Sequence, residues 1–62
     1  MNANEFSKGQ TVYGVKAGEF KVIGVRVIGG GLITVVDVRE VQPGGKLGRT
    51  VGMTPECFKA SK

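Results

Sequence analysis

The stretch EFKVIGVRVIGGGLITVVDVREV, residues 19–41, holds two runs of β-branched residues separated by three consecutive glycines. Val and Ile favour the pleated, half-buried surface of a strand, and glycine adopts the positive φ that tight hairpin turns require. A phosphate-binding P-loop would need Lys-Ser or Lys-Thr and then a helix, whereas Leu-Ile-Thr-Val-Val follows Gly31. The stretch therefore predicts a β-hairpin that turns at residues 29–31.

The first run of this stretch does not alternate simply, because its apolar residues change phase at Gly24. A β-bulge at that glycine would restore one continuous apolar face. The predicted core side of the bulged strand is Phe20, Val22, Val25 and Val27. Lys21 and Arg26 would then face solvent on the opposite side.

The second run alternates more regularly. Thr34, Val36 and Val38 share one face, whereas Asp37 and Arg39 share the other. The more polar face also carries three apolar residues, Ile33, Val35 and Val41. Because a chain of 62 residues buries little of its surface alone, these residues lead us to expect a homo-oligomer.

Shorter elements flank the hairpin, and the apolar residues are mainly Val and Ile, with few Ala and Leu. We expect an all-β fold of five strands in one domain over residues 9–62, after a partly flexible segment 1–8 tied down by Phe6. The expected elements are a strand in QTVYGVK (10–16), a loop in QPGGKLG (42–48), a strand in RTVGM (49–53), one helical turn in TPECF (54–58) and a closing strand in KASK (59–62).

The composition is that of a globular protein, with 40% hydrophobic and 23% charged residues. Its net charge of +4 favours contact with polyanions or acidic protein surfaces. The single cysteine cannot form an internal disulfide, and the N-terminal residues include no apolar signal-peptide core. We therefore expect a cytoplasmic protein without a membrane segment.

The side chains that usually carry catalysis are scarce. The chain has no histidine, which excludes Ser-His-Asp and Cys-His arrangements within one subunit, and Cys57 alone cannot form a structural zinc site. Cys57 is either a small buried hydrophobe beside Phe58 or a reactive thiol at a helical turn. The five carboxylates are dispersed as Glu5, Glu19, Asp37, Glu40 and Glu56. We expect a non-enzymatic protein without a cofactor.

The order of these elements resembles the Src-homology-3-like small β-barrel. The matching segments are KGQTVYGVK (8–16), the hairpin EFKVIGVRVIGGGLITVVDV (19–38) and MTPECF (53–58), where such barrels often place a helical turn before the last strand. The resemblance implies a five-stranded barrel with one helical turn near its C-terminal end.

The opening GQTVYGVKAGEFKVIGV (9–25) is similar to a KOW-type element, a strand-turn-strand ribbon that contacts nucleic acid or the ribosome. The matching positions are Gly9, Val12, Gly18 and Val22. The chain departs from that element at Glu19, where a basic or small residue would suit a phosphate better.

The layout also resembles type II dihydrofolate reductase, a tetramer with a shared central pore. The Val-Gln-Ile-Tyr pore motif of that family is missing here. VQPGG shares only Val41 and Gln42 with the motif and lies in a predicted loop. An oligomeric reductase is therefore the most remote of the functional hypotheses.

The basic residues support two other hypotheses. The first is nucleic-acid binding, to DNA or RNA, through a cationic face on which Tyr13 supplies a stacking surface. The alternative is a protein-interaction module, such as an accessory or inhibitory protein of a phage or mobile element. The candidate nucleic-acid-binding residues are Tyr13, Lys16, Lys21, Arg26, Arg39, Lys46 and Arg49.

Overall fold

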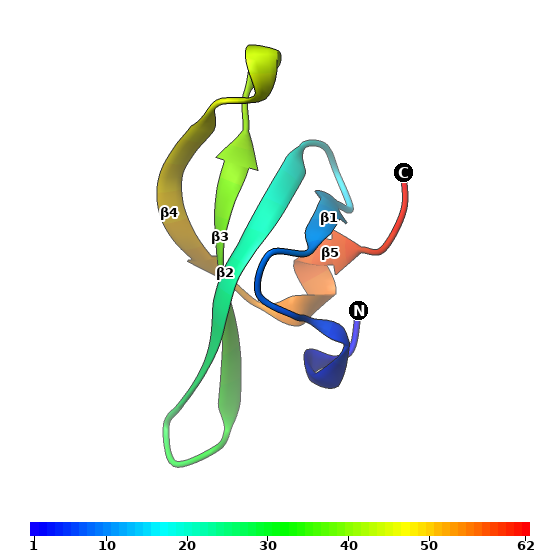
Figure 1. Cartoon of the computed structure of the whole chain (residues 1–62). Coiled ribbons are helices and arrows are strands. Elements are labelled where there is room, and N and C mark those ends of the chain that lie inside the picture. Colours follow the sequence, from blue (N-terminus) through cyan, green and yellow to red (C-terminus); the bar gives the residue numbers. More distant parts are fainter.

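The computed structural model describes all 62 residues apart from the side chain of Ala3, and its fold is all-β, as predicted. Five strands form one antiparallel sheet in the order β4-β3-β2-β1-β5 (Figure 1). The strands are β1 (Thr11–Gly14), β2 (Glu19–Ile28), β3 (Ile33–Val41), β4 (Leu47–Met53) and β5 (Phe58–Lys59). Three single 3₁₀ turns accompany them: η1 (Ala3–Glu5), η2 (Pro43–Gly45) and η3 (Pro55–Cys57).

The sheet bends around a small core but does not close into a barrel. In the described pairings, β4 and β5 are its two edges and share no ladder. Thr54 and the turn η3 connect β4 to the two-residue strand β5, and no ladder joins these two strands in the described pairings. The architecture is thus compatible with a small β-barrel-like fold whose two edges are linked by one turn.

The predicted hairpin between β2 and β3 is confirmed. Gly29, Gly30 and Gly31 have φ of 65°, 67° and 97°, in the left-handed region that glycine adopts without steric cost. The two strands pair from Phe20 with Glu40 to Ile28 with Ile33. The hairpin extends away from the rest of the sheet, which makes the molecule 39 Å long but only 21 by 18 Å across (Figure 1).

The predicted bulge is also present, because the register of β2 against β3 shifts between Val22 and Gly24. Val22 is buried opposite Val38, and the residue without a partner in the ladder is Ile23 rather than Gly24. The prediction that Val25 and Val27 lie in the core is wrong, since their exposed fractions are 41% and 61%.

The core lies where β1, the proximal part of the hairpin and β5 meet. Phe58 packs edge-to-face on Phe6 and Phe20, with ring centroids 5.7 and 5.6 Å apart. Phe6 is 8% exposed, which confirms that it ties the N-terminal segment to the core, and the Met1 ammonium group donates to the Phe58 carbonyl at 3.0 Å. The buried side chains are Phe6, Val12, Val22, Val36, Val38 and Phe58.

Candidate nucleic-acid interface

The face of the sheet opposite the core carries a row of polar side chains centred on Tyr13. Tyr13 of β1 pairs with Glu19 of β2 on one side and with Lys59 of β5 on the other. Side chains that are directly opposite in an antiparallel pair stand on the same face. The half-buried Tyr13 ring therefore has a carboxylate on one flank and an ammonium group on the other, and the Nζ atom of Lys62 lies 5.8 Å from its centroid.

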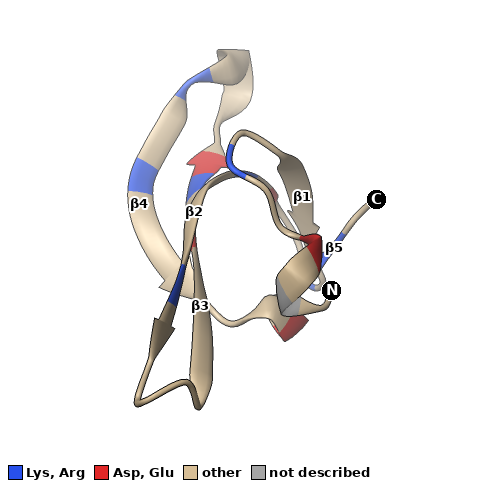
Figure 2. Ribbon diagram, turned by 60° about the horizontal axis from the view of Figure 1, so that its bottom comes forward, with Lys and Arg blue, Asp and Glu red and all other residues tan. Residues whose placement is uncertain are grey.

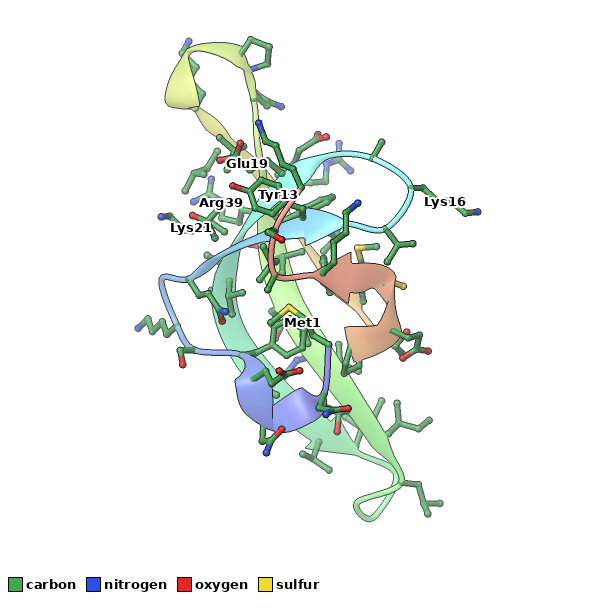
Figure 3. All side chains as sticks on the ribbon, turned by 90° about the vertical axis from the view of Figure 1, so that its right-hand side faces the viewer. Met1, Tyr13, Lys16, Glu19, Lys21 and Arg39 are labelled. Carbon is green, nitrogen blue, oxygen red and sulfur yellow. The ribbon has the colours of Figure 1, made fainter. Side chains whose placement is uncertain are left out.

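A second row on the same face brings two predicted cations together. Lys21 of β2 pairs with both Thr11 and Arg39. Like charges directly opposite each other repel, and here each finds a different acceptor. The Lys21 ammonium group donates to Thr11 Oγ1 at 3.4 Å, while Arg39 Nε donates to the Gly48 carbonyl of β4 at 2.7 Å. Figure 3 shows Tyr13, Glu19, Lys21 and Arg39 close together on this face.

An open groove of about 380 Å³ lies beside Tyr13, between the β1–β2 loop and the C-terminal residues. The loop closes through a bond from the Gly14 N–H to the Gly18 carbonyl at 2.9 Å. Lys16 lines the groove from this loop, and its side chain extends outward, away from Tyr13 (Figure 3). The charged side chains that line the groove are Lys16, Glu19, Lys59 and Lys62. Three cations against one carboxylate give the groove a net positive charge.

Arg26, a predicted member of the cationic face, is engaged in an ion pair. Its Nε and Nη2 atoms donate to the two carboxylate oxygens of Asp37 at 2.7 and 2.9 Å. This hydrogen bonding lowers the pKa of Asp37 and raises that of Arg26. The pair carries no net charge, so Arg26 adds little to the attraction of an anion.

Lys46 and Arg49 lie on the other side of the molecule from the groove. Both are exposed, Lys46 just before β4 and Arg49 within it. β4 is one edge of the sheet, separated from β1 by β3 and β2, and its basic segments lie across the molecule from β1 (Figure 2). The seven predicted residues therefore do not form one continuous patch.

Two cations of the groove, Lys59 and Lys62, were not among the residues predicted to bind. Lys59 follows the buried Phe58, and the pairing of β5 with β1 places it opposite Tyr13. In the sequence, the only indication was that the apolar Phe58 is followed by the basic Lys59, which predicts that the two side chains lie on opposite faces of a strand. It could not be used without the strand order, because only the pairing of β5 with β1 brings this short segment to Tyr13.

A second, more apolar pocket of about 370 Å³ lies on the core side of the β1–β2 loop. Cys57 lines it and is partly buried, with its Sγ 3.6 Å from Thr54 Oγ1. Hydrogen bonds from its own backbone and from Thr54 lower the pKa of the neighbouring Glu56. The apolar side chains around the pocket are Val15, Ala17, Phe20 and Met53.

Among the described residues, no three His, Cys, Asp or Glu side chains gather where they could hold a metal ion. In the same part of the chain, no helix is long and apolar enough to cross a membrane. Comparisons with protein-family models, with curated proteins and with solved structures found no match to this chain. Any function must therefore be argued from the site itself.

Proposed function

We propose that the chain is a non-enzymatic, Src-homology-3-like protein that binds single-stranded nucleic acid through the groove beside Tyr13. The observation that carries the proposal is the placement of Lys59 and Lys62 against the Tyr13 ring, with Lys16 at the rim. The strand order, with η3 placed directly before β5, supports the assignment to the Src-homology-3-like class. The unpaired Cys57 is consistent with a cytoplasmic protein.

The chemistry of the groove matches the two parts of a nucleotide. Ammonium groups attract the phosphates, and an aromatic ring offers a surface on which any base can stack. Glu19 stands on the opposite flank of Tyr13 from Lys59 and would repel a phosphate there. The backbone of the bound strand would therefore follow the lysine side of the groove, with a base over Tyr13.

Fluorescence anisotropy of a labelled single-stranded oligonucleotide, measured at several salt concentrations, tests this proposal. Three lysine–phosphate contacts predict a slope of about −2 in a plot of log K against log salt. Lys16→Gln should reduce the magnitude of the slope by about 0.7, and Lys16→Gln together with Lys59→Gln by about 1.4. Lys46→Gln is the matched control, because it removes the same charge on the far side of the sheet.

A second variant pair tests the role of the ring. Tyr13→Leu should weaken binding by about 1–3 kcal/mol, whereas Tyr13→Phe should bind like the wild type, because stacking needs the ring and not the hydroxyl. The proposal fails if no binding occurs at low salt. It also fails if Lys46→Gln weakens binding as much as Lys16→Gln does, since that result would show diffuse attraction by net charge.

The apolar pocket beside Cys57 favours one other function, a protein-interaction module. Phe20 and Met53 line this pocket, and Val15 at its rim is 56% exposed. A partner that inserts an apolar side chain there would bind with little dependence on salt, unlike a polyanion. A salt titration therefore separates the two functions, and an inhibitory or accessory protein of a phage or mobile element would belong to this second class.

A further inference from the structure

The distal part of the β2–β3 hairpin is a two-stranded ribbon whose outer edges have no described partner. β1 pairs with β2 only over Glu19–Lys21, and β4 pairs with β3 only from Val36 onwards. Ile23–Ile28 therefore forms an open edge of six residues, and Ile33–Val35 forms a shorter one. An open edge presents unpaired backbone N–H and C=O groups, and a hairpin alone is only marginally stable in water.

Six of the nine large apolar side chains that are exposed in the structure lie in this ribbon. Residues 27–36 include no charged side chain, and Arg26 at its base is neutralised by Asp37. Val25 and Val27 lie on one face of the ribbon and Ile28 and Ile33 on the other, with Leu32 in the turn, so the ribbon is apolar on both faces. The exposed side chains and their exposed fractions are Ile23 36%, Val25 41%, Val27 61%, Ile28 43%, Leu32 88% and Ile33 46%.

We propose that the β2 edge of this hairpin pairs antiparallel with the β2 edge of a second copy, across a two-fold axis, to form a four-stranded ribbon. A strand is the partner that satisfies open backbone groups, whereas a lipid bilayer would leave them unpaired. When the same strand of two copies pairs antiparallel, the two copies are related by a two-fold axis, and each presents the same surface to the other. The β2 edge is preferred to that of β3 because it offers twice as many residues.

Charge favours a second copy of this chain as the occupant, and the small area limits its affinity. Each copy carries a net charge of +4, so most of its surface repels another copy, but the ribbon is neutral. Pairing of two β2 edges buries the open backbone edge and the adjoining surfaces of Val25, Val27 and Ile28, so the interface is smaller than the about 1,200–2,000 Å² of stable complexes. A weak dimer, with a dissociation constant in the micromolar range, is therefore expected. The proposal is independent of nucleic-acid binding, because the hairpin turn lies at the lower end of the molecule in Figure 3 and Tyr13 lies in its upper half.

Sedimentation equilibrium of the wild-type chain from about 1 µM to about 1 mM tests the proposal. The mass should rise from one chain to two across this range. Val27→Lys should weaken the association at least about tenfold, because the interface would have to bury a charge. Val15→Lys is the matched control, since Val15 is 56% exposed on the β1–β2 loop, away from the ribbon, and should dimerise like the wild type. Circular dichroism of both variants confirms that each remains folded.

Hydrogen exchange identifies the edge that pairs. Amides of residues 23–28 that face the open edge should exchange more slowly at the dimeric concentration than at the monomeric one, while those of residues 33–35 should not change. A chain that stays monomeric at about 1 mM overturns the proposal, as does equal loss of association in the two Lys variants. Binding of the monomer to neutral phosphatidylcholine vesicles, abolished by Val27→Lys, would also overturn it in favour of a lipid surface.

Discussion

The proximal and distal parts of the β2–β3 hairpin use the same residue types on the same face and reach opposite degrees of burial. In the proximal part Val22 and Val38 are partners and both are buried, whereas at the start of the distal part Val36 is buried and its partner Val25 is 41% exposed. Met53 of β4 lies beside Val36 on its other side, whereas the free edge of β2 lies beside Val25. Strand alternation therefore decides which face an apolar side chain occupies, and the neighbouring elements decide whether that face is covered.

The largest effect on stability is expected from removing the Phe58 ring, which covers the proximal part of the hairpin. Phe58→Ala deletes a side chain that is 1% exposed and contacts both Phe6 and Phe20. The loss should be about 3–5 kcal/mol. Typical domains of this length have only about 3–9 kcal/mol of total stability, so the variant should be largely unfolded by circular dichroism and urea titration.

Leu32→Ala is the counterpart in the distal part. Leu32 is 88% exposed at the hairpin turn, so its truncation should change the free energy of unfolding of the monomer by less than about 0.5 kcal/mol. Urea titration at a concentration where the chain is monomeric measures this value. If Phe58→Ala and Leu32→Ala had similar effects, the proposed division between a covered and an uncovered part would be wrong.

Gly14 and Gly24, which do not have a positive φ, allow the backbones of the covered part and of the hairpin to be compared by replacement with alanine. A Cβ on Gly14 would clash with the Ala17 carbonyl oxygen unless the β1–β2 loop moved, whereas a Cβ on Gly24 would meet nothing within 4 Å. Gly14→Ala should therefore cost about 1–3 kcal/mol. Gly24→Ala should be neutral or stabilising by up to about 1 kcal/mol, since Ala loses less backbone entropy on folding.

Thermal unfolding of the two alanine variants provides the measurement. If Gly24→Ala lowered the stability as much as Gly14→Ala does, the bulge would require glycine at position 24. In that case the phase change in β2 would depend on glycine at this position, and not only on the ladder between β2 and β3.

Much of the fold could be predicted from local residue patterns. The glycines at 29–31 and the break in alternation near Gly24 act within a few residues, so the turn and the bulge followed from the sequence. The burial of Val25 and Val27 depends on where β1 and β4 end, which is a property of distant segments. For the same reason the sequence predicted the direction of these side chains and not their exposure.

The candidate site was less predictable because it is assembled across strands. Tyr13 and Lys16 were predicted, but Lys59 reaches Tyr13 only through the pairing of β5 with β1. Arg26 was expected to be a free cation, and its ion pair with Asp37 depends on the register that the bulge sets between β2 and β3. Charge counts indicate how many cations a chain has, whereas the register determines which of them are already neutralised.

The smallest expected effect concerns this ion pair, which lies where the covered part of the hairpin meets the distal ribbon. The pKa of Asp37 is lower in the folded protein than its ordinary value of 3.8, chiefly because of the hydrogen bonds from Arg26. At a pH between the Asp37 pKa of the folded protein and that of the unfolded chain, the unfolded chain binds more protons than the folded one. The stabilisation from the ion pair is therefore complete above about pH 5 and is lost as the pH falls through this range. Asp37→Asn should therefore show a weaker loss of stability than the wild type between about pH 5 and pH 2. Glu56, whose pKa is also lowered, leaves some acid sensitivity in both proteins.

The control for this prediction is Glu40→Gln, which removes an exposed carboxylate from the same strand, outside the ion pair. Urea midpoints at a series of pH values compare the three proteins. An Asp37→Asn profile parallel to that of the wild type, or a Glu40→Gln profile that flattens instead, would contradict the ion pair as the source of the acid sensitivity. Hydrogen exchange at the same pH values adds a local readout: if the Arg26–Asp37 pair links the two parts of the hairpin, protonation of Asp37 should speed exchange in the distal ribbon before it affects the amides near Val22 and Val38.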